Sequence, residues 1–118
     1  MSKREPDYAD CLSASWLGER LGGTPSRVEA MRREGELLAV RRSGSVEWLY
    51  PAWQFDGWAP RRGVARIVAA ARDAELDEST LYELLTAPLG MRGTHRSRLA
   101  DLLVAGREDE VVAAVRSA

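Results

Sequence analysis

Long apolar runs are missing from this chain of 118 residues, and the two longest, Ile67 to Ala71 and Val111 to Val115, are five residues each. A helix needs about 20 apolar residues to cross a bilayer. We therefore predict no transmembrane helix and no membrane partner. The first residues, Met1 to Pro6, are charged and no apolar segment follows them, so we predict no secretory signal and a cytoplasmic location.

Cysteine and histidine are almost absent, because Cys11 and His95 are the single examples of each. One cysteine allows no internal disulfide and no cysteine metal cluster. His95 lies in a polar stretch without a nearby carboxylate, so it lacks the orienting group that a catalytic histidine needs. The sequence also lacks a glycine-rich phosphate loop. We predict that the protein is not an enzyme and has no metal, no cofactor and no small-molecule substrate.

Lysine is scarce too, since 16 of the 17 basic residues are arginine, and the net charge is only −1. The arginines are unevenly distributed. The range 20–62 contains eight arginines and five acidic residues, whereas the range 64–118 contains seven and nine. A basic first half and an acidic second half predict different partners for the two halves.

The first half has the pattern of two short helices followed by a β-hairpin. Ser13 is a plausible N-cap for a helix of about nine residues, and Thr24-Pro25 begins a second helix that runs to about Glu34. After Gly35 the apolar period changes to two, and Ser43-Gly44 interrupts the alternation as a hairpin turn does. This order of elements is that of a winged helix-turn-helix.

Gly18 lies inside the first predicted helix, where glycine costs about 1 kcal/mol relative to alanine. We predict that it allows the second helix to approach closely. The alternative is that it ends the first helix early.

The polar face of the second helix is predicted to enter the major groove of DNA. An arginine can hold guanine O6 and N7 with two hydrogen bonds, and Arg33 is the best candidate for reading a base. Serine and threonine near the helix start can bond phosphate. The alternative is a solvated face, because acidic residues lower the positive potential here. The predicted DNA-binding residues of this helix are Thr24, Ser26, Arg27, Glu29, Ala30, Arg32 and Arg33.

Arg41 and Arg42 place two cations just before the hairpin turn. We predict that both contact phosphates or an adjacent minor groove. Their alternative role is to protect an exposed strand edge from pairing with another chain.

The first half also resembles a known family. The resemblance rests on the segments Leu12-Ser13 to Leu21-Gly22, Gly23 to Val28, Arg32 to Leu37 and Tyr50-Pro51. They resemble the DNA-binding half of MerR- and excisionase-like winged helices.

The segment between Trp48 and Trp58 holds five of the eight aromatic residues. We predict that they pack the hairpin against C-terminal helices, and the alternative is a partner surface on which Trp58 is exposed. Further apolar stripes predict four more helices: one over Val64 to Ala71, one after the N-cap Asp77, and two around Leu99 to Leu103 and Val111 to Val115.

The second half is similar to the Xre/MbcA/ParS family of bacterial antitoxins. The matching residues are Tyr50, Pro51, Gln54, Phe55 and Asp56, then Leu85 and Pro88, then Leu102, Leu103, Gly106 and Val111. The family often has Ser-Pro or Thr-Pro at the start of its third helix, whereas this chain has Arg98-Leu99, so we expect Thr94 or Ser97 to cap that helix.

This resemblance implies an antitoxin whose C-terminal helices block a RES-domain toxin, an enzyme that consumes NAD, while the N-terminal half represses the shared operon. The acidic start of the last helix suits a cationic partner surface, and the alternative is a solvated helix start. The predicted partner-binding residues are Trp58, Leu102, Leu103, Gly106, Arg107 and Val111.

The predicted fold is mainly α with one β-hairpin. We expect a flexible tail (1–11), a winged helix-turn-helix (12–56), a connector (57–63) and a C-terminal helical partner-binding domain (64–118). The predicted partners are double-stranded DNA of the protein's own promoter, a RES-domain toxin and a second copy of the chain. The alternatives to a DNA-binding antitoxin are a stand-alone MerR- or excisionase-like regulator and an interaction module that does not bind DNA.

Overall fold

The computed structural model describes residues 8–21, 23–57, 59–88 and 98–118, and it is mostly helical with small antiparallel sheets. The helices are α1 (Ala14–Arg20), α2 (Pro25–Arg33), α3 (Val64–Asp73), α4 (Glu78–Thr86), α5 (Leu99–Val104) and α6 (Glu108–Arg116), with a 3-10 turn η1 (Ala52–Gln54). The strands are β1 (Cys11–Ser13), β2 (Val40–Arg41), β3 (Trp48–Pro51), β4 (Phe55–Asp56) and β5 (Ala59–Pro60). The prediction of a mainly helical fold is confirmed.

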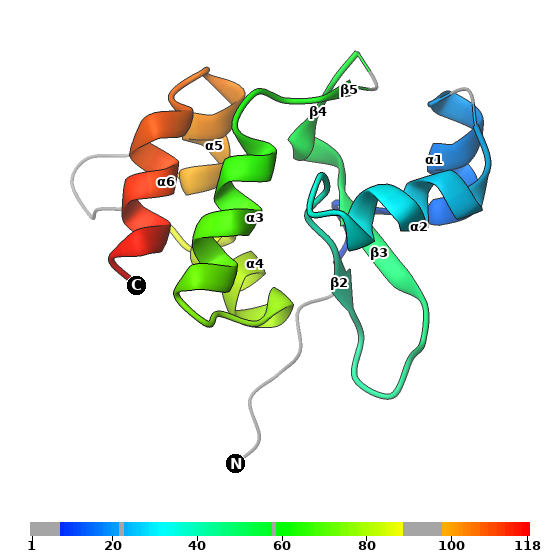
Figure 1. Ribbon diagram of the computed structural model, residues 1–118, viewed down its shortest axis with the longest axis horizontal. Coiled ribbons are helices and arrows are strands. Elements are labelled where there is room, and N and C mark those ends of the chain that lie inside the picture. The colour runs from blue at the N-terminus through cyan, green and yellow to red at the C-terminus, as the bar shows by residue number, and fades with distance from the viewer. Residues whose placement is uncertain (1–7, 22, 58, 89–97) are drawn as a thin grey trace.

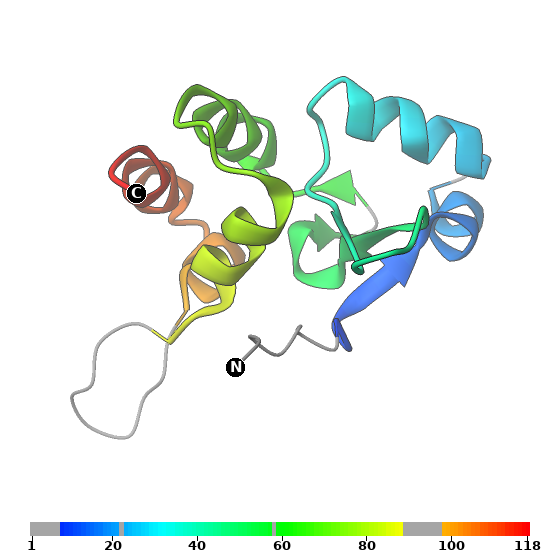
Figure 2. The same cartoon turned by 90° about the horizontal axis from the view of Figure 1, so that it is seen from below.

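The elements form two groups that follow the order of the chain. Figure 1 shows α1, α2 and the sheet on the right and α3 to α6 on the left. The β2–β3 hairpin extends downward from the first group, beside α2. The view in Figure 2 shows that α2 and α3 lie along the same edge of the molecule.

Three of the predicted helix starts are confirmed by side-chain caps. Ser13 Oγ accepts a hydrogen bond from the Trp16 backbone N–H at 3.2 Å, and Thr24 Oγ1 accepts one from Arg27 N–H at 3.3 Å. Asp77 Oδ1 accepts one from Thr80 N–H at 2.8 Å, and this bond lowers the pKa of the Asp77 carboxyl.

The start of α5 differs from its prediction. Its N-cap position is Arg98, whose backbone N–H donates to Asp101 Oδ2 at 2.9 Å. The acidic side chain of the first turn therefore satisfies the cap backbone in place of a hydroxyl. The expected caps Thr94 and Ser97 lie outside the described residues.

Close packing of α1 on the start of α2 depends on Gly18, as predicted. A Cβ at this position would lie 2.9 Å from the carbonyl carbon of Thr24 and 3.0 Å from the nitrogen of Pro25. Both atoms belong to the backbone and cannot move aside easily. The absence of a side chain at Gly18 thus sets the distance between the two helices.

The β-structure is richer than the single predicted hairpin. The hairpin itself is present, because β2 pairs antiparallel with β3 with Val40 opposite Leu49. However, β1 pairs with the other edge of β3, with Cys11 opposite Pro51, so the sheet has three strands in the order β1-β3-β2. The signal in the sequence was weak because β1 is only three residues long.

The predicted flexible tail is wrong for residues 8–11. Tyr8 is only 4% exposed, and its ring lies edge-on to Tyr82 of α4 with the ring centroids 5.1 Å apart. Cys11 begins β1, and the Asp10 carbonyl accepts a hydrogen bond from Ala52 N–H at 2.8 Å. A polar sequence is ordered here by contacts with distant elements. Residues 1–7 lie outside the described part of the chain.

The predicted connector also contains structure, because β5 pairs antiparallel with β4. Arg61 Nε donates to the Trp53 carbonyl at 2.9 Å, which ties the segment before α3 to η1. Trp58 lies outside the described residues.

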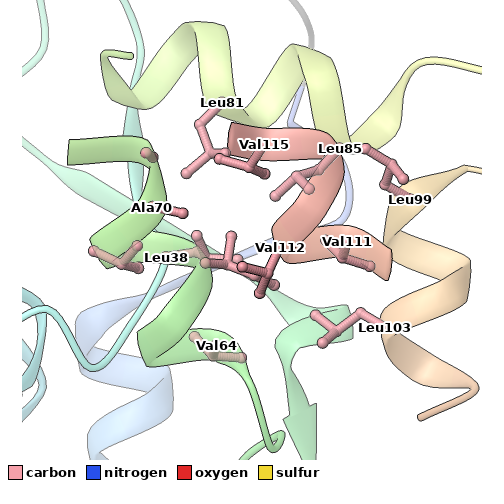
Figure 3. Close-up of a cluster of buried hydrophobic side chains, with 13 residues drawn as sticks. Leu38, Val64, Ala70, Leu81, Leu85, Leu99, Leu103, Val111, Val112 and Val115 are labelled. Carbon is pink, nitrogen blue, oxygen red and sulfur yellow. The ribbon is translucent and has the colours of Figure 1, made fainter. Parts of the chain in front are cut away.

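Three apolar clusters hold the molecule together. The largest lies among α3 to α6 and includes one residue of the first half, Leu38 (Figure 3). A second lies under α1 and α2 and contains Leu17, Val28, Tyr50 and Phe55. The third joins Tyr8 and Val40 to Tyr82 of α4. Among the described aromatic residues of the segment, Tyr50, Phe55 and Trp48 therefore pack under α1 and α2, and only Trp53 packs against the C-terminal helical cluster as predicted.

Gln54 of η1 forms hydrogen bonds to the segment between α2 and β2. Its side chain is fully buried and accepts a hydrogen bond from Leu38 N–H at 2.7 Å. Its amide nitrogen donates to the carbonyls of Leu38 at 2.9 Å and Pro51 at 3.1 Å. All of these backbone groups would otherwise be buried without partners.

In the described part of the chain, none of the helices has the length and apolar character needed to span a bilayer.

Candidate nucleic-acid interface

The helix α2 buries one face and exposes the other. Val28 is 1% exposed and Met31 packs against the cluster under α1 and α2. On the opposite face most of the predicted DNA-binding residues are exposed: Thr24, Ser26, Arg27, Ala30 and Arg33. Glu29 and Arg32 are half-buried, because they lie on the flank of α2 that faces the sheet.

Trp48 of β3 joins α2 to the hairpin. The guanidinium of Arg32 lies 4.2 Å from the centre of the Trp48 ring, and that of Arg41 lies 4.4 Å from it. Both are cation–π contacts, which restrict the two arginine side chains. The helix and the hairpin therefore present a continuous cationic surface that includes Arg32, Arg33 and Arg41.

Arg42 makes a different ring contact from Arg41, although both line the same depression beside the start of α4. Its guanidinium lies 5.4 Å from the centre of the Tyr8 ring, whereas that of Arg41 lies over Trp48. That both arginines contact DNA stays a prediction.

Acidic residues at the start of α4 lie close to the hairpin. Asp77, Glu78 and Ser79 line a shallow polar depression of about 300 Å³ together with Arg41 and Arg42. These carboxylates reduce the positive potential around the hairpin relative to that of α2. The strongest candidate for an anion-binding surface is therefore the exposed face of α2.

Two polar atoms beneath α2 are buried without a hydrogen-bond partner in the part of the chain that the structure describes: Arg32 Nε and the Tyr50 hydroxyl. Burial raises the pKa of the Tyr50 hydroxyl, and the nearby Arg32 guanidinium acts against that shift. Tyr50 thus stays neutral under the cationic face.

The predicted partner-binding residues differ in exposure: some are buried in the core and others are at the surface. Leu103 and Val111 are 2% and 0% exposed, and Figure 3 shows both inside the helical core, so they are unavailable to a partner. Leu102 is half-buried against the same core. Gly106 and Arg107 are exposed, and Arg107 forms an ion pair with Glu110. A leucine and valine stripe at helical spacing proved to be core, and Trp58 lies outside the described residues.

One cation near the site was missed by sequence reasoning. Arg72 of α3 lies against the end of α2, because a Cβ on Gly35 would be 2.9 Å from Arg72 Nη1. Gly35 has a φ of +79°, as expected for the residue that follows a helix end. The sequence carried no signal for Arg72, since nothing in its spacing relates it to a helix almost 40 residues earlier.

A second polar cluster lies away from α2, where β1, η1 and α4 meet. Asp10 accepts hydrogen bonds from the Tyr82 hydroxyl at 2.5 Å and from Trp53 Nε1 at 2.8 Å. The Cys11 thiol donates to Asp10 at 3.5 Å. Burial and the neighbouring Asp10 raise the pKa of Cys11 to about 12 and also raise that of Tyr82. This cluster links three separate segments and suits a structural role.

Within residues 8–21, 23–57, 59–88 and 98–118, no group of three or more histidine, cysteine, aspartate or glutamate side chains could hold a metal ion. His95 lies outside this part of the chain.

Comparison with known proteins gives a likeness of fold. No protein-family model matches the chain, and no curated protein matches it. The arrangement of helices and small sheets is that of a solved structure, which covers 99% of this chain with a TM-score of 0.77. That structure is the NMR structure of Rv2175c, which is 23% identical in sequence, and 83% of its chain is covered.

Proposed function

We propose that this protein binds double-stranded DNA as a winged helix-turn-helix, with α2 in the major groove and the β2–β3 hairpin as the wing. The observation that carries the proposal is the exposed arginine-bearing face of α2, which is continuous with Arg41 through the Trp48 ring. The major groove of B-DNA is wide enough to admit an α-helix such as α2.

Each proposed DNA-contacting residue has a role that follows from its place on α2 or on the hairpin. Thr24 and Ser26, at the helix start, bond phosphate through their hydroxyl groups. Arg27 and Arg33 lie on the exposed face, and Arg33 reads a base edge. Arg41 binds phosphate beside the groove, as the first cation of the wing.

The proposal is tested by fluorescence anisotropy with a duplex from the DNA upstream of the protein's own gene. The affinity for the duplex should fall steeply as the salt concentration rises. Arg33→Ala should weaken the binding free energy by about 1 to 3 kcal/mol. Arg116→Ala is the matched control, since Arg116 is an exposed arginine in the last turn of α6. Undetectable or salt-independent binding, or equal loss in the control, would contradict the proposal.

Neutralisation of a RES-domain toxin is a second proposal, and it rests on the resemblance to the Xre/MbcA/ParS family. The exposed turn between α5 and α6 favours it as a contact surface, because Gly106 and Arg107 are exposed and Val104 is 45% exposed. The residues proposed to contact the toxin are Leu102, Gly106 and Arg107.

A neighbouring reading frame for a RES-domain enzyme would support this second proposal. Co-expression with that enzyme tests it directly: the wild-type protein should restore growth, and Arg107→Glu should not. Arg116→Glu is a control, since Arg116 is exposed in the last turn of α6, at the opposite end of that helix from Arg107. Deletion of residues 106–111 is unsuitable because it removes Val111 from the core.

We further propose that the protein acts as a homodimer, because a half-site reader of this size gains contacts by pairing on DNA. Sedimentation equilibrium with and without the duplex measures the stoichiometry. One protomer per duplex would contradict this part of the proposal.

A further inference from the structure

A cavity of about 310 Å³ lies where the two groups of elements meet, between the end of α2, β3 and the helices α3 and α4. Its rim carries Arg32 and Arg33 from α2 and Arg72 from α3, and Trp48 forms part of its wall. We name this space the arginine cavity. Its volume is at the lower end of the range of about 300 to 1,000 Å³ that is usual for small-molecule sites.

The arginine cavity has an excess of unneutralised positive charge. Three guanidiniums line it against the single carboxylate of Glu78. Among the described residues, none of these three arginines forms an ion pair. Such groups favour an anion that supplies the missing acceptors.

The remaining wall of the arginine cavity is apolar. Val68 and Ala71 of α3 contribute to it, and so do Leu76 and Leu81. An inorganic anion would leave these side chains without contacts, whereas a ligand with an apolar body would bury them. Trp48 also contributes to the wall, but its ring is already in cation–π contact with Arg32 and Arg41.

We propose that the arginine cavity binds a small organic anion that combines an apolar body with one carboxylate. The carboxylate is held by Arg72 and Arg33, and the apolar body lies against the aliphatic wall. This is a ligand site, and no chemical reaction is assigned to it. It goes beyond DNA binding, for which no small molecule is needed.

One consequence, unlike binding itself, rests on the proposed function. Arg32 and Arg33 belong both to the arginine cavity and to the face of α2 that is proposed to contact DNA. An anion in the cavity would occupy the hydrogen-bond donors of Arg33 and so weaken DNA binding.

The test uses 2-naphthoate as the probe and neutral 2-naphthamide as its matched control, measured by calorimetry and by amide chemical shifts of the full chain. We expect 2-naphthoate to bind and to shift the amides of Trp48, Val68 and Arg72. Arg72→Ala should weaken binding about tenfold, as expected for a lost charge-assisted hydrogen bond. Arg66→Ala should bind normally, because Arg66 lies on the same helix but pairs with Asp109 of α6 at 2.7 Å.

The Arg72→Ala variant needs a folding check, since Arg72 packs against Gly35. Its thermal melt is compared with that of Arg72→Lys, which keeps the charge and should lose less affinity. Equal binding of 2-naphthamide, unchanged binding by a folded Arg72→Ala, or no binding at about 1 mM would overturn the inference.

The failure of this inference is distinguishable from failure of the proposed function, because the titration contains no DNA. Binding of 2-naphthoate without any binding of the duplex would remove the DNA proposal alone. Binding of the duplex without binding of 2-naphthoate would remove the cavity proposal alone.

Discussion

At the scale of single residues, a few positions without obvious chemistry fix the geometry of the site. Gly18 sets the spacing of α1 and α2, and Gln54 holds the backbone that leads from α2 into β2. Neither residue contacts the exposed face of α2. Both determine where that face lies.

Gly18→Ala should lower the free energy of unfolding by about 1 to 3 kcal/mol, although alanine is the better helix former, because its Cβ would overlap the backbone of Thr24. Urea denaturation followed by circular dichroism measures the change. Gly23→Ala is the matched control, since its Cβ meets only the flexible side chain of Arg27. A Gly18→Ala variant as stable as the control would show that the close approach is unimportant.

Gln54→Met should cost about 2 to 4 kcal/mol of folding stability, because a side chain of similar size would leave Leu38 N–H and two carbonyls buried without partners. The measurement is the same urea titration. A loss of only a few tenths of a kcal/mol would mean that these backbone groups find other partners.

Cys11 provides a prediction about pH. Its folded-state pKa is raised from 9.0 to about 12, so the unfolded chain releases the thiol proton first as the pH rises. The contribution of Cys11 to stability is therefore complete below pH 9 and is lost between about pH 9 and pH 12. Cys11→Ala should show a smaller loss of stability from pH 8 to pH 10.5 than the wild type. An identical loss would contradict the assignment.

At the scale of elements, the sequence predicted most of the helices because each has a local signal. Ser13, Thr24 and Asp77 are caps that the structure confirms, and Gly35 ends α2 as expected. The short strands had no such signal. β1 exists through pairing with β3, nearly 40 residues away, and not through its own sequence.

The candidate site was predictable on α2 and only partly on the hairpin. A helical period placed Arg27 and Arg33 on the exposed face correctly. The different ring contacts of Arg41 and Arg42, with Trp48 and with Tyr8, depend on residues far apart in the sequence and carry no local signal. Arg72 could not have been found, because its place depends on how α3 packs against the end of α2.

The orientation of the hairpin arginines leads to a paired prediction. Arg41→Ala should weaken DNA binding, because Arg41 lies on the α2 side against Trp48, whereas Arg42→Ala should have a smaller effect. Fluorescence anisotropy at about 0.1 M salt measures both variants. Equal losses would show that the wing reaches DNA from both of its faces.

At the scale of the whole molecule, the two groups of elements are built into each other. Leu38 of the first half lies in the helical core, and Asp10 binds Tyr82 of α4. The sequence suggested separate domains because composition and charge change along the chain, whereas the packing that joins the halves involves isolated residues. Unfolding of one half would therefore remove packing contacts from the other half.

This packing predicts one cooperative unfolding transition. Tryptophan fluorescence, which includes Trp16 of α1 and Trp48 of β3, should change together with the helical circular dichroism signal. Tyr82→Phe should lower the common midpoint by removing the hydrogen bond to Asp10. Two transitions with different midpoints would show that the halves fold independently.

The central claim is that α2 and the α2 side of the hairpin form the DNA-binding surface. Amide chemical-shift mapping on addition of the upstream duplex tests it most directly. We expect the largest shifts at Thr24 to Arg33 and at Arg41, with little change in α5 and α6. Shifts centred on α5 and α6, with α2 unaffected, would contradict the account.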